Sequence, residues 1–319
     1  MTWLILTLAS IIFWGVTDIL LKKSLNYTDS LSQYKTFIWI GLESAPVSVV
    51  MAIFSDSLSD SVRIIADNPY IIPINAFYVI AMFFGLLGAK HLDASVVSPL
   101  ENIDGAITAI ILYLFFFLSG HNHVTESVGV VDVMGTVAIT VGVVLLGIQE
   151  QKLSKQEMSF DEDKKKHRLG ALALLFPIVY NLADAVSMVA TGIMVSGETE
   201  FSIPDMDYIF FESLAFFVFA IFVWLYILIA KKHMYNPFKK TEAFRMGAAI
   251  CETFGTLSFT FAVAINPILT APITSSYCLV TIILARIFLN ERLTKKQYLS
   301  LVTLVVGIAL LGLSEIFSA

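Results

Sequence analysis

Long apolar runs separated by short polar stretches follow one another along the whole chain. A helix rises about 1.5 Å per residue, so about 20 apolar residues cross the hydrocarbon core of a bilayer. Since backbone polar groups inside lipid must be satisfied within their own segment, such runs are expected to be helices. The runs predict ten transmembrane spans, at residues 3–22, 35–54, 70–89, 95–118, 127–148, 169–194, 207–230, 246–265, 268–289 and 297–317.

These spans form two similar sets of five. The fifth and tenth spans match at seven positions, in the same order and with the same spacing: Val137, Val141, Gly142, Leu145, Leu146, Gly147 and Glu150 recur as Val302, Val306, Gly307, Leu310, Leu311, Gly312 and Glu315. Pro99 and Pro272 likewise match early in the fourth and ninth spans. An odd number of spans per copy forces the second copy into the opposite orientation, and such inverted repeats are typical of secondary transporters.

The largest polar segment lies between the two sets. It divides the chain into a first five-helix repeat at residues 1–148, a charged cytoplasmic linker at 149–168 and a second five-helix repeat at 169–319. The linker and the four loops on the same predicted side hold 18 of the 20 Lys and Arg residues. The positive-inside rule therefore predicts that these loops are cytoplasmic and that both termini are extracytoplasmic.

Composition supports an integral membrane protein. The chain is 57% hydrophobic and 14% charged, with a mean hydropathy of +0.81, whereas soluble domains carry about 25% charged residues. The net charge of -6 and the lack of a basic stripe argue against nucleic acid as a partner. Cys251 and Cys278 lie in apolar runs without the spacing of a metal or redox motif, so neither a metal nor a cofactor is expected.

Several short motifs resemble one family of transporters. They are Phe13-Trp14-Gly15 with Lys22 in the first span, the two matched prolines, the closing glycine patterns, and the acidic turn at residues 290–294. On these motifs the chain resembles the drug/metabolite transporter superfamily, in its ten-helix EamA-like branch. The resemblance implies five plus five helices around a central cavity and transport of small metabolites. In the first half, residues 119–123 replace the acidic turn, and the charge bias opposes the cytoplasmic termini usual in the family.

Acidic residues inside the spans are the main candidates for function. A carboxylate at the centre of a bilayer costs roughly 2.5–3.5 kcal/mol, so each must face water, find a partner or bind a proton. Arg286 is the only clearly intramembrane cation, with Lys22, Lys23 and Lys90 at span ends. Such a balance favours binding of cations, and it also suits exchange of H+ as a coupling ion.

Two matched pairs carry the sharpest signal. Trp14 and Asp18 are four residues apart and share one face of the first span, and Tyr180 and Asp184 repeat the pair at the corresponding place in the sixth span. An aromatic face beside a carboxylate is what a desolvated ammonium group needs. The predicted substrate-binding residues are Trp14, Asp18, Glu43, Glu101, Asp104, Tyr180, Asp184, Glu212 and Glu252.

Other interpretations of these residues stay open. Glu101, Asp104 and Thr108 share a predicted helix face just after Pro99, which breaks the hydrogen-bond ladder. Glu43 and Glu212 match between the halves, but a structural hydrogen bond or an interfacial position would also explain them. Glu252 and Asp132 lie near span ends, and the two aromatic residues could simply pack.

The sequence therefore predicts an all-α membrane protein, not an enzyme. We expect a secondary active transporter of a small cationic or zwitterionic metabolite, such as an amine, quaternary ammonium compound or amino acid. It would work by alternating access, with H+ as a possible coupling ion. The alternatives are transport of a phosphorylated or nucleotide-sugar metabolite, which the scarcity of intramembrane Lys and Arg disfavours, and a cation channel. We expect a monomer or homodimer in the plasma (inner) membrane.

Overall fold

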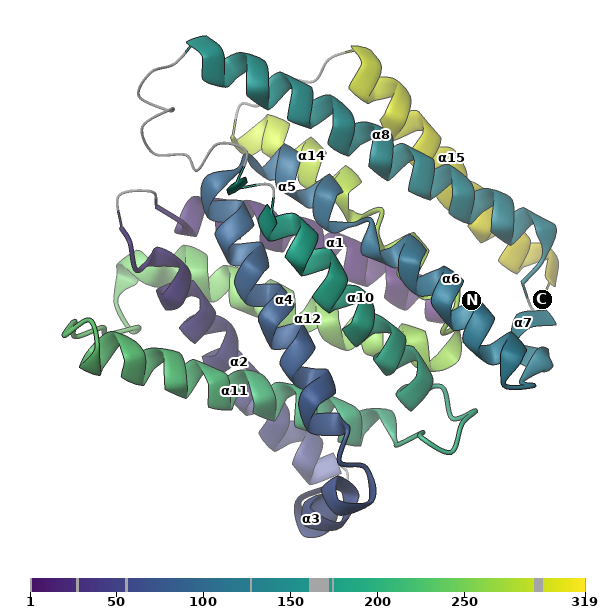
Figure 1. Cartoon of the computed structure of the whole chain (residues 1–319), viewed down its shortest axis with the longest axis horizontal. Helices are drawn as coiled ribbons and strands as arrows, with labels where there is room; N and C mark the ends of the chain where they lie inside the picture. Colours follow the sequence, from purple (N-terminus) through teal and green to yellow (C-terminus); the bar gives the residue numbers. More distant parts are fainter. Residues whose placement is uncertain are drawn as a thin grey trace.

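The computed structural model describes residues 2–26, 29–54, 57–126, 128–160, 172–173, 175–289 and 295–318, and these residues form helices joined by short loops (Figure 1). The helices are α1 (Thr2–Ser24), α2 (Ser32–Phe54), α3 (Ser57–Asp67), α4 (Ile71–His91), α5 (Ala94–Glu101), α6 (Asp104–Leu118), α7 (Asn122–Glu126), α8 (Val130–Phe160), α10 (Leu175–Val195), α11 (Asp205–Ile229), α12 (Ala243–Ile265), α13 (Thr270–Thr274), α14 (Tyr277–Phe288) and α15 (Lys295–Ser318). No strand occurs among the residues described.

The expected membrane-crossing segments are present as helices. Nine segments of the described chain are long and apolar enough to span a bilayer. Two of them, Val97–Leu118 and Thr270–Phe288, each combine a pair of helices, α5 with α6 and α13 with α14. A tenth helix, α15, has a shorter apolar part, Tyr298–Leu311, than the predicted span at 297–317. The predicted all-α membrane fold is therefore confirmed.

The predicted linker begins as helix. α8 continues through Phe160, well past the predicted end of the fifth span at 148. Residues 149–160 contain no Gly or Pro and are rich in Gln, Lys and Glu, which favour helix. The local sequence therefore allows the helix to continue beyond the predicted end of the span. Residues 161–168 of the predicted linker and the acidic turn at 290–294 lie outside the described residues.

The fourth and ninth spans are broken at matching places. α5 ends at Glu101 and α6 begins at Asp104, while α13 ends at Thr274 and α14 begins at Tyr277. Each break follows a proline, Pro99 inside α5 and Pro272 in α13. Because proline lacks an N–H group and crowds the preceding turn, it weakens the ladder at both points.

The long helices pack mainly between the two halves of the chain. α1 packs along α12, α2 along α11, α4 along α10 and α8 along α15. Small residues permit the closest approaches: a Cβ on Gly41 of α2 would lie 2.2 Å from the Cβ of Ala220 on α11. A Cβ on Gly135 of α8 would likewise lie 3.0 Å from the carbonyl oxygen of Gly307 on α15. Such contacts are typical of helices packed inside membranes.

The connections sort into two ends of the bundle. In Figure 1 the two termini lie toward one end, together with α7, and the C-terminal ends of α1 and α11 lie at the opposite end. The latter end carries the basic residues Lys22, Lys23, Lys231 and Lys232. We call it the basic end.

Candidate functional site

A central cavity lies between the two halves of the bundle, with about 780 Å³ of space free of protein atoms, including the part open to solvent. Eight helices contribute side chains to its wall: α1, α4, α5, α6, α10, α11, α12 and α14. Eight of the nine predicted substrate-binding residues line this cavity: Trp14, Asp18, Glu101, Asp104, Tyr180, Asp184, Glu212 and Glu252. The ninth, Glu43, lies half-buried on α2 and is not among the residues that line the cavity.

Asp18 and Trp14 form one wall of the cavity. The Thr281 hydroxyl of α14 donates a hydrogen bond of 2.7 Å to the Asp18 carboxylate. The Trp14 ring contacts Phe259 and Tyr277, with centroid distances of 5.3 and 5.8 Å. The indole Nε1–H of Trp14 is buried and has no hydrogen-bond partner among the residues that the structure describes. This wall therefore presents aromatic faces, an unused donor and a carboxylate together.

Tyr180 and Asp184 lie on the wall contributed by α10. A Cβ on Gly85 of α4 would lie 3.0 Å from the Tyr180 ring, so this glycine makes room for the aromatic side chain. Asp184 is buried, and its carboxyl group interacts with Tyr180 and Asp104. The two predicted aromatic–acid pairs thus line one cavity, but the acids have different neighbours.

The break between α5 and α6 positions two further acids. The sequence predicted that Glu101 and Asp104 share one continuous helix face. In the structure Glu101 ends α5 and Asp104 begins α6, so the two residues lie on either side of the break. Both side chains still line the cavity, because the break is only one turn long. Glu101 is buried, and within the described part of the chain its Oε1 has no hydrogen-bond partner. Thr108 is buried but does not line the cavity.

Asn181 of α10 holds this break in place. Its side-chain oxygen accepts a hydrogen bond of 2.8 Å from the backbone N–H of Asp104. Its side-chain nitrogen donates to the carbonyl oxygen of Leu100 and, at 2.8 Å, to that of Pro177. One side chain therefore satisfies a backbone group on each side of the break, which a bilayer would otherwise leave unpaired.

Glu212 and Glu252 are buried cavity residues, not interfacial ones. Glu252 accepts a hydrogen bond of 3.0 Å from the Tyr78 hydroxyl, which also contacts the Thr256 hydroxyl at 3.2 Å. Asp132, by contrast, lies at the start of α8 away from the cavity and accepts a hydrogen bond of 2.7 Å from the backbone N–H of Gly129. Asp132 is the third residue of α8 and reaches back to the N–H of the residue before the helix, as the acidic residue of a capping box does.

The wall of the cavity is acidic. It includes six carboxyl groups and no Lys, Arg or His among the described residues that line it. The basic residues that the sequence places in or near the spans lie outside the cavity wall. Arg286 is exposed and contacts the Tyr298 hydroxyl. Lys22 donates to the carbonyl oxygens of Ala89 and Leu92, and Lys90 donates to Gln33.

A sequence model of the EamA-like transporter family matches residues 175–313. The second half of the chain therefore matches the EamA-like transporter family. The family consists of membrane transporters, so this EamA-like protein is a multi-pass membrane protein with a small-molecule substrate.

One crystal structure, described only as that of a protein, is similar to this EamA-like chain over 99% of both chains, with a TM-score of 0.62 and 14% sequence identity. At that identity the likeness extends to the fold alone. None of the curated proteins compared with the chain matches it.

Three cavity or support residues of this EamA-like transporter were not predicted from the sequence: Tyr78, Asn181 and Tyr277. A single Tyr or Asn in an apolar span carries no local signal that separates a cavity position from ordinary packing. The only available hint for Asn181 is its position three residues before Asp184, on an adjacent part of the same helix surface.

Proposed function

We propose that this transporter carries a small organic cation or zwitterion, such as an amine, a quaternary ammonium compound or an amino acid. The observation that carries the proposal is the central cavity, with six carboxyl groups, aromatic faces at Trp14 and Tyr180, and no basic side chain in its described wall. The proposal extends the transport function of the family to a substrate class.

The physical basis is the cost of moving a cation out of water. An ammonium group about 4 Å from one carboxylate gains about 4 kcal/mol at an effective dielectric constant of about 20. An aromatic face adds about 0.5–2 kcal/mol by cation–π attraction. A phosphorylated or nucleotide-sugar substrate would instead need Arg or Lys in the wall, so the cavity favours the cation.

Proton coupling is supported by the pair Asp104 and Asp184. Both carboxyl groups are buried in the cavity wall and interact with each other. Two neighbouring buried carboxylates repel each other, which favours a proton on one of them. If a bound cation takes the place of that proton, the two would cross the membrane in opposite directions, which is a simple basis for coupling to H+.

Alternating access of two inverted halves is supported by the packing pattern. The first helix of each half packs on the third helix of the other half, α1 on α12 and α10 on α4. The second helices pair with each other, as do the fifth, α2 with α11 and α8 with α15. Exchange of the halves leaves this list of contacts unchanged, as an inverted repeat over residues 1–148 and 169–319 requires.

The test is transport by purified protein in liposomes, with quaternary ammonium compounds, polyamines, amino acids and phosphorylated metabolites as probes. We expect saturable flux of a cationic or zwitterionic probe, driven by an opposing pH gradient. Asp18→Asn and Asp184→Asn should each reduce that flux about tenfold or more, in line with the loss of one charge contact. Glu43→Gln is the matched control, because this carboxylate does not line the cavity, and it should retain most of the flux.

Two results would overturn the proposal. One is flux or thermal stabilisation by phosphorylated compounds alone. The other is unchanged flux of every probe in both Asp→Asn variants, which would mean that the cavity carboxylates do not recognise the substrate.

A further inference from the structure

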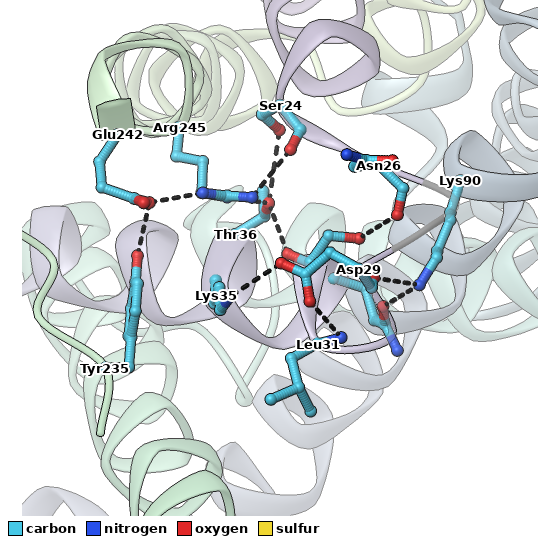
Figure 2. Close-up of polar contacts among 12 residues, drawn as sticks. Ser24, Asn26, Asp29, Leu31, Lys35, Thr36, Lys90, Tyr235, Glu242 and Arg245 are labelled. Carbon is cyan, nitrogen blue, oxygen red and sulfur yellow. Dashed lines mark hydrogen bonds and ion pairs between the residues drawn. The ribbon is translucent and has the colours of Figure 1, made fainter. Parts of the chain in front are cut away.

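A buried polar network closes over the basic end of the bundle (Figure 2). It joins the end of α1, the start of α2, the end of α4, the start of α12 and the loop before α12. Its buried members include Ser24, Gln33, Thr36, Lys90, Tyr235 and Glu242. Buried charged groups are costly unless they are paired, so the pairing defines the geometry of this end.

Arg245 is the residue that crosses between the two halves of the chain. It lies on α12, and its guanidinium group donates to the carbonyl oxygen of Ser24 at 2.9 Å and to the Thr36 hydroxyl at 3.2 Å. It also pairs with Glu242 at 2.6 Å, and Glu242 accepts a second hydrogen bond of 2.7 Å from Tyr235. One rigid guanidinium fork therefore fixes the ends of α1 and α2 to α12.

Lys90 makes the corresponding connection from α4. Its ammonium group donates to the Gln33 side chain at 2.7 Å and to the carbonyl oxygen of Asp29 at 2.9 Å. The Asp29 carboxylate in turn accepts a hydrogen bond of 2.7 Å from Lys35. Together these contacts hold Asp29 and the start of α2 against the end of α4 (Figure 2).

The charge on Asp29 is secured over the neutral pH range. Burial opposes the charged form, but the hydrogen bonds from Lys35 and the Leu31 backbone N–H outweigh it and hold the pKa of this carboxyl group below its ordinary value of 3.8. The ionised Asp29 therefore stabilises the folded protein at pH values above its ordinary pKa. This contribution is lost only as the pH falls through the lower pKa of the folded state.

This network lies between the cavity and the basic end. Leu21 and Ala89 line the cavity, and Ser24 and Lys90 follow them within one helical turn. On α12, the cavity residue Glu252 lies two turns beyond Arg245. A substrate that left the cavity between α1, α4 and α12 would therefore have to separate the groups that Arg245 and Lys90 hold together.

We infer that the Arg245 network is the gate at the basic end of the cavity, and that this structure has that gate closed. Opening requires Arg245 to release the ends of α1 and α2, which separates the first half of the chain from the second. At the opposite end, the His123–Glu198 pair also crosses between the halves, at 2.6 Å, but its side chains are 64% and 36% exposed. The inference rests on transport by the family, and it does not depend on the class of substrate.

The test measures access to the cavity from the basic end without any substrate. Ala89→Cys, in a background with both native cysteines replaced, reports access to the cavity wall through its rate of labelling by a membrane-impermeant thiol reagent. Lys232→Cys, at an exposed loop position, identifies which membrane face is the basic end. Labelling is compared in intact cells and inside-out vesicles.

We expect Arg245→Gln to increase the rate of labelling at position 89 from the basic end about tenfold or more. The reason is that each hydrogen bond to a buried charged group changes an equilibrium constant by about a factor of ten. Arg63→Gln is the matched control, since Arg63 pairs with Asp67 at the exposed surface of the other end and should leave the rate unchanged. Glu242→Gln keeps the shape of the side chain and should increase the rate less, which provides a second folded variant.

An unchanged labelling rate in both folded variants would overturn the gate. So would an equal increase from both membrane faces, which would indicate general loosening of the bundle. Because no substrate is added, either result leaves the cation proposal standing, and failure of that proposal leaves the gate standing.

Discussion

Trp14 and Tyr180 each lie against a glycine of a neighbouring helix. Trp14 packs on Gly255 of α12, and Tyr180 packs on Gly85 of α4. The two contacts occupy corresponding places in the two halves, since α1 with α12 corresponds to α10 with α4. The aromatic faces of the cavity are therefore set by the absence of a side chain opposite each ring.

Gly255→Ala should disturb the Trp14 wall directly. The added Cβ would lie 2.5 Å from the Trp14 ring, so the indole must move. Overpacking of this kind costs about 1–3 kcal/mol, and we expect a lower thermal unfolding temperature in detergent together with weaker binding of the transported cation. The measurement is a thermal melt with and without that cation.

Gly247→Ala, on the same helix, is the control for this change. Its added Cβ would lie 3.4 Å from Leu20, an ordinary contact, so it should leave both properties nearly unchanged. Equal behaviour of the two variants would mean that Trp14 has free space to adjust and that its position is not critical.

The sequence predicted the aromatic–acid pairs because each lies within one helical turn. It could not predict their supports, because Gly255 and Thr281 come from helices in the other half of the chain. Nor could it separate Glu43 from Glu212, which occupy matched positions in matched tripeptides. The difference depends on how α2 and α11 rotate about their axes when they pack, and local sequence does not determine this.

At the scale of helices, the breaks in the fourth and ninth spans decide where the acids lie. The sequence shows both prolines, and it predicts weakened helix hydrogen bonding near Pro99. The break in the fourth span also depends on a tertiary contact, because Asn181 of α10 hydrogen-bonds to the end of α5 and to the start of α6. Element boundaries within an apolar run are therefore set by tertiary partners as much as by proline.

Asn181→Ala should destabilise this break. It leaves the carbonyl of Leu100 and the N–H of Asp104 without their partner, at a cost of about 1–3 kcal/mol for each buried group. We expect a lower unfolding temperature, and also weaker dependence of flux on the pH gradient, because Asp104 loses its fixed position beside Asp184. The measurements are a thermal melt and liposome flux at two pH gradients.

Asn236→Ala is the comparison for that variant. Asn236 is exposed and accepts a hydrogen bond from the Phe238 backbone N–H in the loop before α12. It should change neither property by much. If Asn181→Ala melted and transported like Asn236→Ala, water would be an adequate substitute for the amide, and Asn181 would have no positioning role.

For the whole molecule, both chain ends lie toward the end of the bundle opposite the basic loops (Figure 1). The positive-inside rule then favours extracytoplasmic termini, against the orientation usually drawn for this family. We expect an alkaline phosphatase fused after Ala319 to be active and a green fluorescent protein at the same site to be dark. The reverse pattern would show that the basic end faces outward.

The pairing of helices between halves also has a consequence for biosynthesis. Trp14 and Asp18 are made early, yet Gly255 and Thr281, which hold them, are made only near the end of the chain. The first five helices must therefore remain in the bilayer with an acidic, half-built surface until the later ones arrive. Folding to the native state is in this sense a late event, because the cavity wall at Asp18 forms only after α14 has been synthesised and has docked against α1.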